Sequence, residues 1–250
     1  MQAPPTLTSD DALFLDFDGT LVAIAETPEG IVLPATLIPL LRELHDLLGG
    51  AVALVSGRQI AALDRFLAPL RLPSAGEHGA QRRDAAGRVH EQAAPALGFV
   101  LEACDALAAA HPGLLVERKQ AAVALHYRQA PQLQALCRAT LVPLLADQPQ
   151  FELLHGKCVF EVKPAGMNKG LAIAAFLQEA PFAGRRPVFA GDDTTDESGF
   201  AVVQPRGGAA IKVGTGPSQA LQRLVDPAAV LRWLAKSRDR LALAPQGIRA

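Results

Sequence analysis

The chain has few of the residues that mark disulfide-rich or zinc-binding proteins. Its 250 residues include three cysteines, one tryptophan and one tyrosine. Cys104, Cys137 and Cys158 are far apart and odd in number, which excludes a disulfide framework and a cysteine-based metal site. Buried free thiols are typical of a reducing compartment, so we expect a cytoplasmic protein.

Long apolar runs and an excess of one charge are also missing. No run is long enough to span a bilayer, and residues 1–9 have neither the basic nor the apolar segment of a signal peptide. Lys and Arg (24) nearly balance Asp and Glu (25), so bulk charge favours neither a nucleic-acid nor a membrane partner. Half of the residues are hydrophobic, enough for one sizeable core or two smaller ones.

The most informative stretch follows the apolar run of residues 12–15. It reads Asp-Phe-Asp-Gly-Thr and contains Asp16, Asp18, Gly19 and Thr20. A strand that ends there places both acids at its carboxyl edge, where open α/β sheets bind ligands. Two such close carboxylates repel, and a divalent cation relieves the repulsion; Mg²⁺ prefers this kind of oxygen ligand. The alternative is a strand that ends in a solvated Asp turn.

Hydrophobic periodicity predicts an α/β fold with an insertion. Strands at 12–16, 51–55, 187–190 and 209–213 alternate with helices, which favours a doubly wound, Rossmann-like parallel sheet. Residues 81–163 instead read as strand pairs separated by helices, including a hairpin at 82–88. We therefore expect a core of residues 1–79 and 167–250, and an α+β module of residues 80–166 inserted into it.

Three other segments place polar groups at strand ends or helix starts. They contribute Ser56 with Arg58, Lys169, and the acidic group Asp192, Asp193 and Asp196. A doubly wound sheet brings these segments to one edge. Taken singly, each has an ordinary explanation: a turn at Ser56, a surface lysine, and acids that stabilise a helix N-terminus.

Together these groups suit phosphoryl transfer through a covalent carboxylate intermediate. Asp16 is the expected nucleophile and Asp18 the general acid and base. We expect Asp16, Asp192 and the backbone carbonyl of Asp18 to hold Mg²⁺. Lys169 and Ser56 are then placed to bind the phosphoryl oxygens, with backbone N–H groups at helix N-termini.

The chain resembles the haloacid-dehalogenase-type (HAD) phosphatase superfamily, and within it the trehalose-6-phosphate phosphatase family. The segments that carry the resemblance are Leu15–Leu21, Val55–Arg58, Asn168–Gly170, Ala190–Glu197 and Gly76–Gly79. It implies a HAD-like core with an inserted C2-type cap that closes over the pocket. It also implies a Mg²⁺-dependent phosphatase for trehalose 6-phosphate, a phosphorylated disaccharide.

The resemblance assigns roles in the inserted module and around the phosphate. It implies that Glu117, Lys119 and Glu161 bind the sugar hydroxyls, although alternating charges on a hairpin can also be a solvated face. The substrate-binding set that it implies is completed by Asp18, Gly19, Thr20, Ser56, Gly57, Arg58 and His78. Asp193 and Asp196 are expected to support the metal ligands from behind.

Two alternatives stay open from the sequence. A related HAD enzyme that hydrolyses sucrose phosphate or a hexose phosphate would carry the same core motifs. An inactive regulatory domain would keep the fold but lose one of Asp16, Asp18, Lys169 or Asp192, all of which are present. We expect a monomer that could associate with trehalose-phosphate synthase, and a cap that turns about 79–80 and 164–166.

Overall fold

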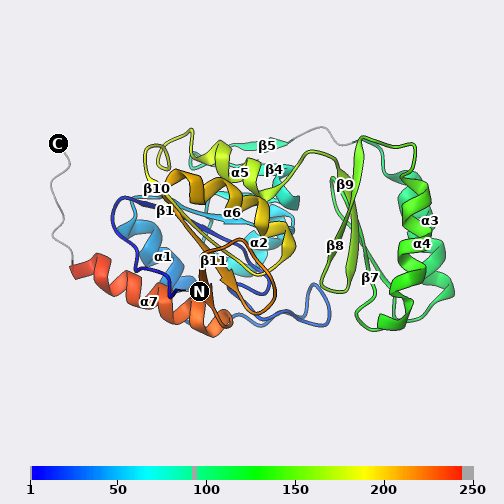
Figure 1. Ribbon diagram of the computed structural model, residues 1–250, viewed down its shortest axis with the longest axis horizontal. Helices are drawn as coiled ribbons and strands as arrows, with labels where there is room; N and C mark the ends of the chain where they lie inside the picture. The colour runs from blue at the N-terminus through cyan, green and yellow to red at the C-terminus, as the bar shows by residue number, and fades with distance from the viewer. Residues whose placement is uncertain (1, 92–94, 244–250) are drawn as a thin grey trace.

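Two β-sheets organise the chain into a larger and a smaller lobe (Figure 1). The computed structural model describes residues 2–91 and 95–243. Within these residues no helix has the length and apolar character that crossing a membrane requires.

The larger sheet has eight strands in the order β12-β11-β10-β1-β2-β3-β4-β5. Neighbours from β12 to β3 pair in parallel, and β4 and β5 add an antiparallel edge. The central strands are buried along their whole length because helices cover both faces. This confirms the predicted doubly wound α/β core. The strands are β1 (Asp11–Leu15), β2 (Val52–Val55), β3 (Ser74–Gly76), β4 (Gln81–Arg83), β5 (Val89–Glu91), β10 (Arg186–Gly191), β11 (Ala209–Val213) and β12 (Gln222–Leu224).

Helices pack in pairs against the larger sheet. The pair α1 (Leu37–Leu47) and α7 (Pro227–Leu243) lies below the strands in Figure 1, and the pair α5 (Lys169–Phe176) and α6 (Glu197–Val203) lies above them. The remaining helix, α2 (Ile60–Leu67), packs near β3 and β4. Short 3₁₀ segments are η1 (Glu77–Gly79), η3 (Thr194–Asp196) and η4 (Gln204–Arg206).

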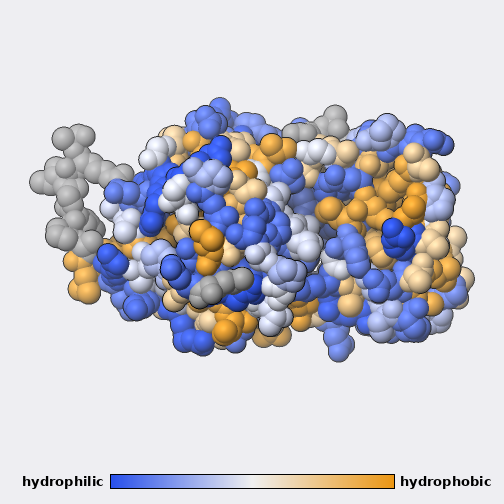
Figure 2. Space-filling model, viewed as in Figure 1, coloured by the Kyte–Doolittle hydropathy of each residue, from blue (hydrophilic) through white to orange (hydrophobic). Residues whose placement is uncertain are grey.

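The smaller lobe, which we call the cap, is an antiparallel sheet backed by two helices. Its strand order is β6-β7-β9-β8. A separate apolar core, which includes Val100, Leu125, Tyr127 and Phe160, joins the sheet to the helices. Figure 2 shows hydrophobic residues gathered on the cap lobe, at the right of the view. Its elements are α3 (Gly98–Ala110), β6 (Leu115–Arg118), β7 (Val123–His126), η2 (Pro131–Leu133), α4 (Gln134–Leu144), β8 (Phe151–Gly156) and β9 (Val159–Pro164).

The sequence predicts that the hairpin at 82–88 is part of the inserted module, and the structure shows that this prediction is wrong. β4 pairs antiparallel with β3, and β5 pairs with β4, so the hairpin extends the core sheet. Its buried Arg83 forms a bidentate ion pair with Asp64 of α2 at 2.6 and 2.7 Å, which fixes the hairpin to the core. We propose that the cap begins after β5 and ends near Pro164. The parts of the expected domain ranges at 1, 92–94 and 244–250 lie outside the described residues.

Candidate active site

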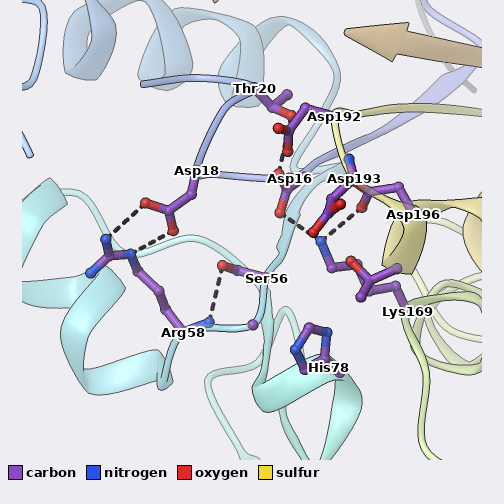
Figure 3. A network of polar contacts seen from close by, with 12 residues as sticks. Asp16, Asp18, Thr20, Ser56, Arg58, His78, Lys169, Asp192, Asp193 and Asp196 are labelled. Atoms are coloured by element: carbon purple, nitrogen blue, oxygen red, sulfur yellow. Dashed lines mark hydrogen bonds and ion pairs between the residues drawn. The ribbon is translucent and has the colours of Figure 1, made fainter. Parts of the chain in front are cut away.

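The site lies where β1, β2 and β10 end. Leu15 is level with Leu54 of β2 and with Ala190 of β10, so the residues that follow each strand emerge side by side. These are Asp16, Ser56 and Asp192, as Figure 3 shows. The predicted convergence of distant segments at one sheet edge is therefore present in the structure.

Asp16 is buried and both of its carboxylate oxygens have a partner. Thr20 Oγ1 donates to Oδ2 at 3.0 Å, and Lys169 Nζ donates to Oδ1 at 2.7 Å. The same ammonium donates to Asp196 Oδ1 at 2.7 Å, so Lys169 bridges two buried carboxylates. Burial disfavours the charged lysine, but the two carboxylates outweigh it and raise the pKa of Lys169.

Asp18 points away from Asp16 and meets an arginine. Arg58 binds its carboxylate through two hydrogen bonds of 2.6 and 2.7 Å, and also donates to the carbonyl of Pro28 at 2.7 Å. The guanidinium carbon lies 5.1 Å from the ring centroid of Phe66. This arrangement leaves the Asp18 side chain one-third exposed, at the mouth of the site.

The acidic groups fit a hard cation. Carboxylate oxygens of Asp16, Asp192 and Asp196 lie within 4.8 Å of one another, and all three residues are buried. Burial, together with the neighbouring acids, raises the pKa of Asp16 and of Asp192. An all-oxygen set with excess negative charge suits Mg²⁺.

Gly19 is required by this close packing. Its φ is +77°, and a Cβ atom there would lie 2.1 Å from Asp192 Oδ2. Only glycine tolerates both the left-handed backbone and the approach of the carboxylate.

Ser56 and His78 form the floor beside Arg58. Ser56 Oγ accepts the Arg58 N–H at 3.2 Å. Glu77 and His78 both have left-handed φ angles, 47° and 57°, each of which costs about 1–2 kcal/mol in a residue with a side chain. Burial lowers the pKa of His78, and in the described part of the chain its Nδ1 has no hydrogen-bond partner. A Cβ on Gly57 would lie 2.8 Å from His78 Nε2, so Gly57 allows this packing.

The cap contributes a second group of charges above this floor. Lys119 Nζ donates to Glu161 Oε2 at 2.7 Å and to the Gly57 carbonyl at 2.9 Å. His78 Nε2 lies 3.6 Å from Glu161 Oε1. Burial opposes the charge on Glu161, but Lys119 and His78 outweigh it and lower the pKa of Glu161. Glu117, on β6, contacts His126 at 2.9 Å.

A cleft lies between the two lobes. Of the residues expected in the site, the cleft is lined by Asp16, Asp18, Ser56, Gly57, Arg58, His78, Glu117, Lys119, Glu161, Lys169, Asp192 and Asp193. Three others stand behind this lining: Gly19, Thr20 and Asp196. Asp193 begins η3 with a capping box, in which Asp196 Oδ2 accepts the Asp193 N–H at 2.9 Å.

Sequence reasoning missed one buried lysine, Lys212, and assigned no partner to a second, Lys157. Lys157, at the β8–β9 turn of the cap, reaches across the cleft and contacts Asp192 Oδ2. Lys212 is buried on β11 and donates to the backbone carbonyl of Asp192. A lone lysine in the apolar strand sequence Ala-Ala-Ile-Lys-Val is a signal that could have revealed Lys212. The position of Lys157 depends on how the lobes meet, which no local pattern encodes.

Known proteins are similar to this chain over most of its length. Residues 14–227 match the family described as Trehalose-phosphatase. Trehalose-6-phosphate phosphatase of Escherichia coli is 46% identical over 241 residues, which is 92% of this chain and 87% of the relative. The probable trehalose-phosphate phosphatase of Sinorhizobium fredii is 47% identical over 205 residues, 81% and 77% of the two chains.

Solved structures agree with the sequence match. A crystal structure of a trehalose-6-phosphate phosphatase related protein has a TM-score of 0.78 and 28% identity, and the match covers 91% of this chain and 97% of that one. Sequence and fold thus agree over both lobes, and the chain belongs to the trehalose-phosphatase family.

Proposed function

We propose that this protein is a Mg²⁺-dependent phosphatase that hydrolyses trehalose 6-phosphate to trehalose and phosphate. The observation that carries the proposal is the buried Asp16 carboxylate, held by Lys169 and Thr20 at the floor of a cleft roofed by a charged cap. The substrate is the one for which the E. coli relative is named.

Asp16 is the nucleophile in this proposal. Because Thr20 and Lys169 each bind one of its oxygens, the carboxylate has a fixed direction before substrate arrives. One Asp16 oxygen bonds to phosphorus while the bond from phosphorus to the sugar oxygen breaks, which gives an aspartyl phosphate and free sugar. Water then attacks the phosphorus and releases phosphate, which restores Asp16.

Asp18 transfers the protons. It gives one proton to the leaving sugar oxygen, and then takes one from the attacking water. Its ion pair with Arg58 holds the carboxylate at the mouth of the cleft, where the leaving group departs. To act, Asp18 turns from Arg58 toward the phosphorus, and the arginine becomes free to contact substrate.

Mg²⁺ is held by Asp16, Asp192 and the backbone carbonyl of Asp18. When bound, it neutralises charge on the phosphoryl oxygens. Asp193 and Asp196 orient the ligands, since Asp196 binds both Lys169 and the N–H of Asp193.

The remaining residues bind the two ends of the substrate. Phosphoryl oxygens are held by Lys169, Ser56 and Thr20, with the backbone at Gly19 and Gly57. The sugar hydroxyls face groups from both lobes, namely Arg58, His78, Glu117, Lys119 and Glu161. Buried carboxylates and ammonium groups in one network suit a ligand with many hydroxyls, since each can donate or accept hydrogen bonds.

A phosphate-release panel tests the proposal. Purified protein is offered trehalose 6-phosphate, sucrose 6-phosphate, glucose 6-phosphate and p-nitrophenyl phosphate, each with Mg²⁺ and with EDTA. We expect trehalose 6-phosphate to give the highest kcat/KM and EDTA to abolish release. The Asp16→Asn variant should keep its fold by circular dichroism and lose turnover. Faster release from sucrose or glucose phosphate would favour the related sugar phosphatase, and no release from any substrate would favour a regulatory domain.

We also propose that the protein is cytoplasmic, in keeping with its three free cysteines. We propose in addition that it is a monomer. Association with a trehalose-phosphate synthase remains part of this proposal, and gel filtration with and without the synthase tests both points.

A further inference from the structure

Glu77 is a buried carboxylate that the proposed chemistry does not use. It is 1% exposed and lies in the left-handed turn that also carries His78. In the described part of the chain no lysine, arginine or histidine forms an ion pair with it. A buried carboxylate without an ion pair is costly unless other groups donate hydrogen bonds to it, so its donors must be identified.

The partners of Glu77 come from the other lobe. Its Oε1 accepts the N–H of Gln120 at 2.9 Å, and its Oε2 accepts the N–H of Ala121 at 2.6 Å. These two residues form the tip of the β6–β7 hairpin, which is closed by the Lys119 N–H to the Ala122 carbonyl at 3.0 Å. Two successive backbone N–H groups at a turn make a natural seat for an anion, and here the anion is supplied by the core.

The same hairpin tip carries Lys119 into the cleft. Lys119 precedes Gln120 directly, and its ammonium spans from Glu161 of the cap to the Gly57 carbonyl of the core. On the core side, the Glu77 N–H donates to the Arg58 carbonyl at 2.9 Å, and the His78 N–H to the Ser56 carbonyl at 3.0 Å. Glu77 therefore joins the loop that holds Ser56 and Arg58 to the hairpin that holds Lys119.

We propose that Glu77 is a positioning residue that docks the cap on the core and sets Lys119 and Glu161 over the pocket. Glu77 lines neither the cleft nor the acidic cluster, so it acts through the hairpin tip rather than on the reacting atoms. When the cap opens, water replaces the two N–H donors, so the Glu77 carboxylate accepts hydrogen bonds in both the closed and the open state. Docking of this kind is reversible and selects one closed position.

The test compares Glu77→Gln with Glu91→Gln. Glu77→Gln keeps the size but places an amide N–H₂ against a backbone donor. Glu91 is exposed, and within residues 2–91 and 95–243 its carboxylate accepts one hydrogen bond, from the side chain of the same Gln120 at 2.9 Å, so Glu91→Gln is a matched control. Both proteins are assayed with trehalose 6-phosphate, which needs the cap, and with p-nitrophenyl phosphate, which does not. Amide hydrogen exchange is measured on the same samples.

We expect Glu77→Gln to lower kcat/KM for trehalose 6-phosphate about tenfold or more, mainly through KM, as loss of a hydrogen bond to a charged group implies. Amides of 119–122 should exchange about tenfold faster, while β1 and β10 keep wild-type exchange. The aryl phosphate and the Glu91→Gln control should stay within about threefold of wild type. Equal losses on both substrates, or unchanged exchange at 119–122, would overturn the proposal.

The choice of trehalose 6-phosphate as substrate rests on the proposed function. Hydrogen exchange distinguishes a failure of that function from a failure of the role proposed for Glu77. If trehalose 6-phosphate is not a substrate, the panel fails, but exchange at 119–122 still reports whether Glu77 docks the cap. If Glu77→Gln does not fold, amide exchange of the wild-type protein tests the proposal by itself. Its Gln120 and Ala121 amides should exchange about tenfold more slowly than those of Lys157 and Cys158, at the tip of the β8–β9 hairpin. Equal exchange at the two tips would overturn the proposal.

Discussion

Replacing Lys169 by methionine tests the centre of the site directly. The ammonium is 3% exposed and makes two hydrogen bonds of 2.7 Å, one to Asp16 and one to Asp196. It joins α5 to the end of β1, across 153 positions of the chain. Methionine has a similar length and no charge, so Lys169→Met removes the compensation and little of the volume.

The expected magnitude follows from the burial. Removing one partner of a buried ion pair costs about 3–5 kcal/mol, because the remaining charge has no compensation. For a chain of this size each kcal/mol lowers the melting temperature by about 2–4 °C, so we expect a fall of about 6–20 °C. The loss of a preorganised cation should also lower kcat by about 10²–10³. Mg²⁺ should restore part of the stability, since it binds the same carboxylates.

Thermal unfolding in EDTA and in Mg²⁺, together with phosphate release, measures both effects. Lys236→Met, on the exposed side of α7, is the matched control and should change neither. A melting temperature within about 1 °C of wild type would refute the reasoning, because it would mean that the buried carboxylates need no ammonium. Stability loss with unchanged kcat would instead refute the role of Lys169 in the chemistry.

Three further changes test other parts of the site and fold. Gly19→Ala should lower kcat at least about tenfold, because the new Cβ displaces the Asp192 carboxylate; a Mg²⁺ titration of phosphate release checks this. Glu117→Ala should raise KM for trehalose 6-phosphate but leave KM for p-nitrophenyl phosphate unchanged. An equal rise in KM for both substrates would count against the sugar-binding role of Glu117. His90 and the backbone N–H of Arg88 lower the pKa of Asp84 to about 2. Its contribution to stability is therefore complete above about pH 4 and lost as pH falls toward 2, so Asp84→Asn should lower the melting temperature at pH 7 but progressively less below pH 4.

The parts of the fold that the sequence predicts are those with strong local patterns. β1 and β2 are almost wholly apolar because both faces are buried, and the acidic motifs follow β1 and β10 directly. The convergence of Asp16, Ser56 and Asp192 follows from the rule that parallel strands end at one edge.

What the sequence did not predict depends on contacts between distant segments. An antiparallel hairpin has the same local pattern whichever sheet it joins, so β4 and β5 could not be assigned to the core from residues alone. The short strand β12 and the helix α6 were also not anticipated. The particular partners of Arg58, Lys157 and Glu77 could not be predicted either. They are Asp18, Asp192 and the β6–β7 tip, and each depends on the relative placement of elements that are separated in the chain.

The strand order has a consequence for how the chain acquires its structure. β1 lies between β2 and β10, yet β10 begins only at Arg186, after the whole cap has been synthesised. A nascent or truncated chain that stops before that point leaves one edge of β1, a strand that is fully buried in the finished fold, without a partner, and such an edge recruits other chains. The cap is one uninterrupted segment with its own apolar core, so it can fold before β10 is synthesised and pairs with β1. Fragments of the N-terminal half should therefore aggregate, and chaperones should engage the growing chain at β1.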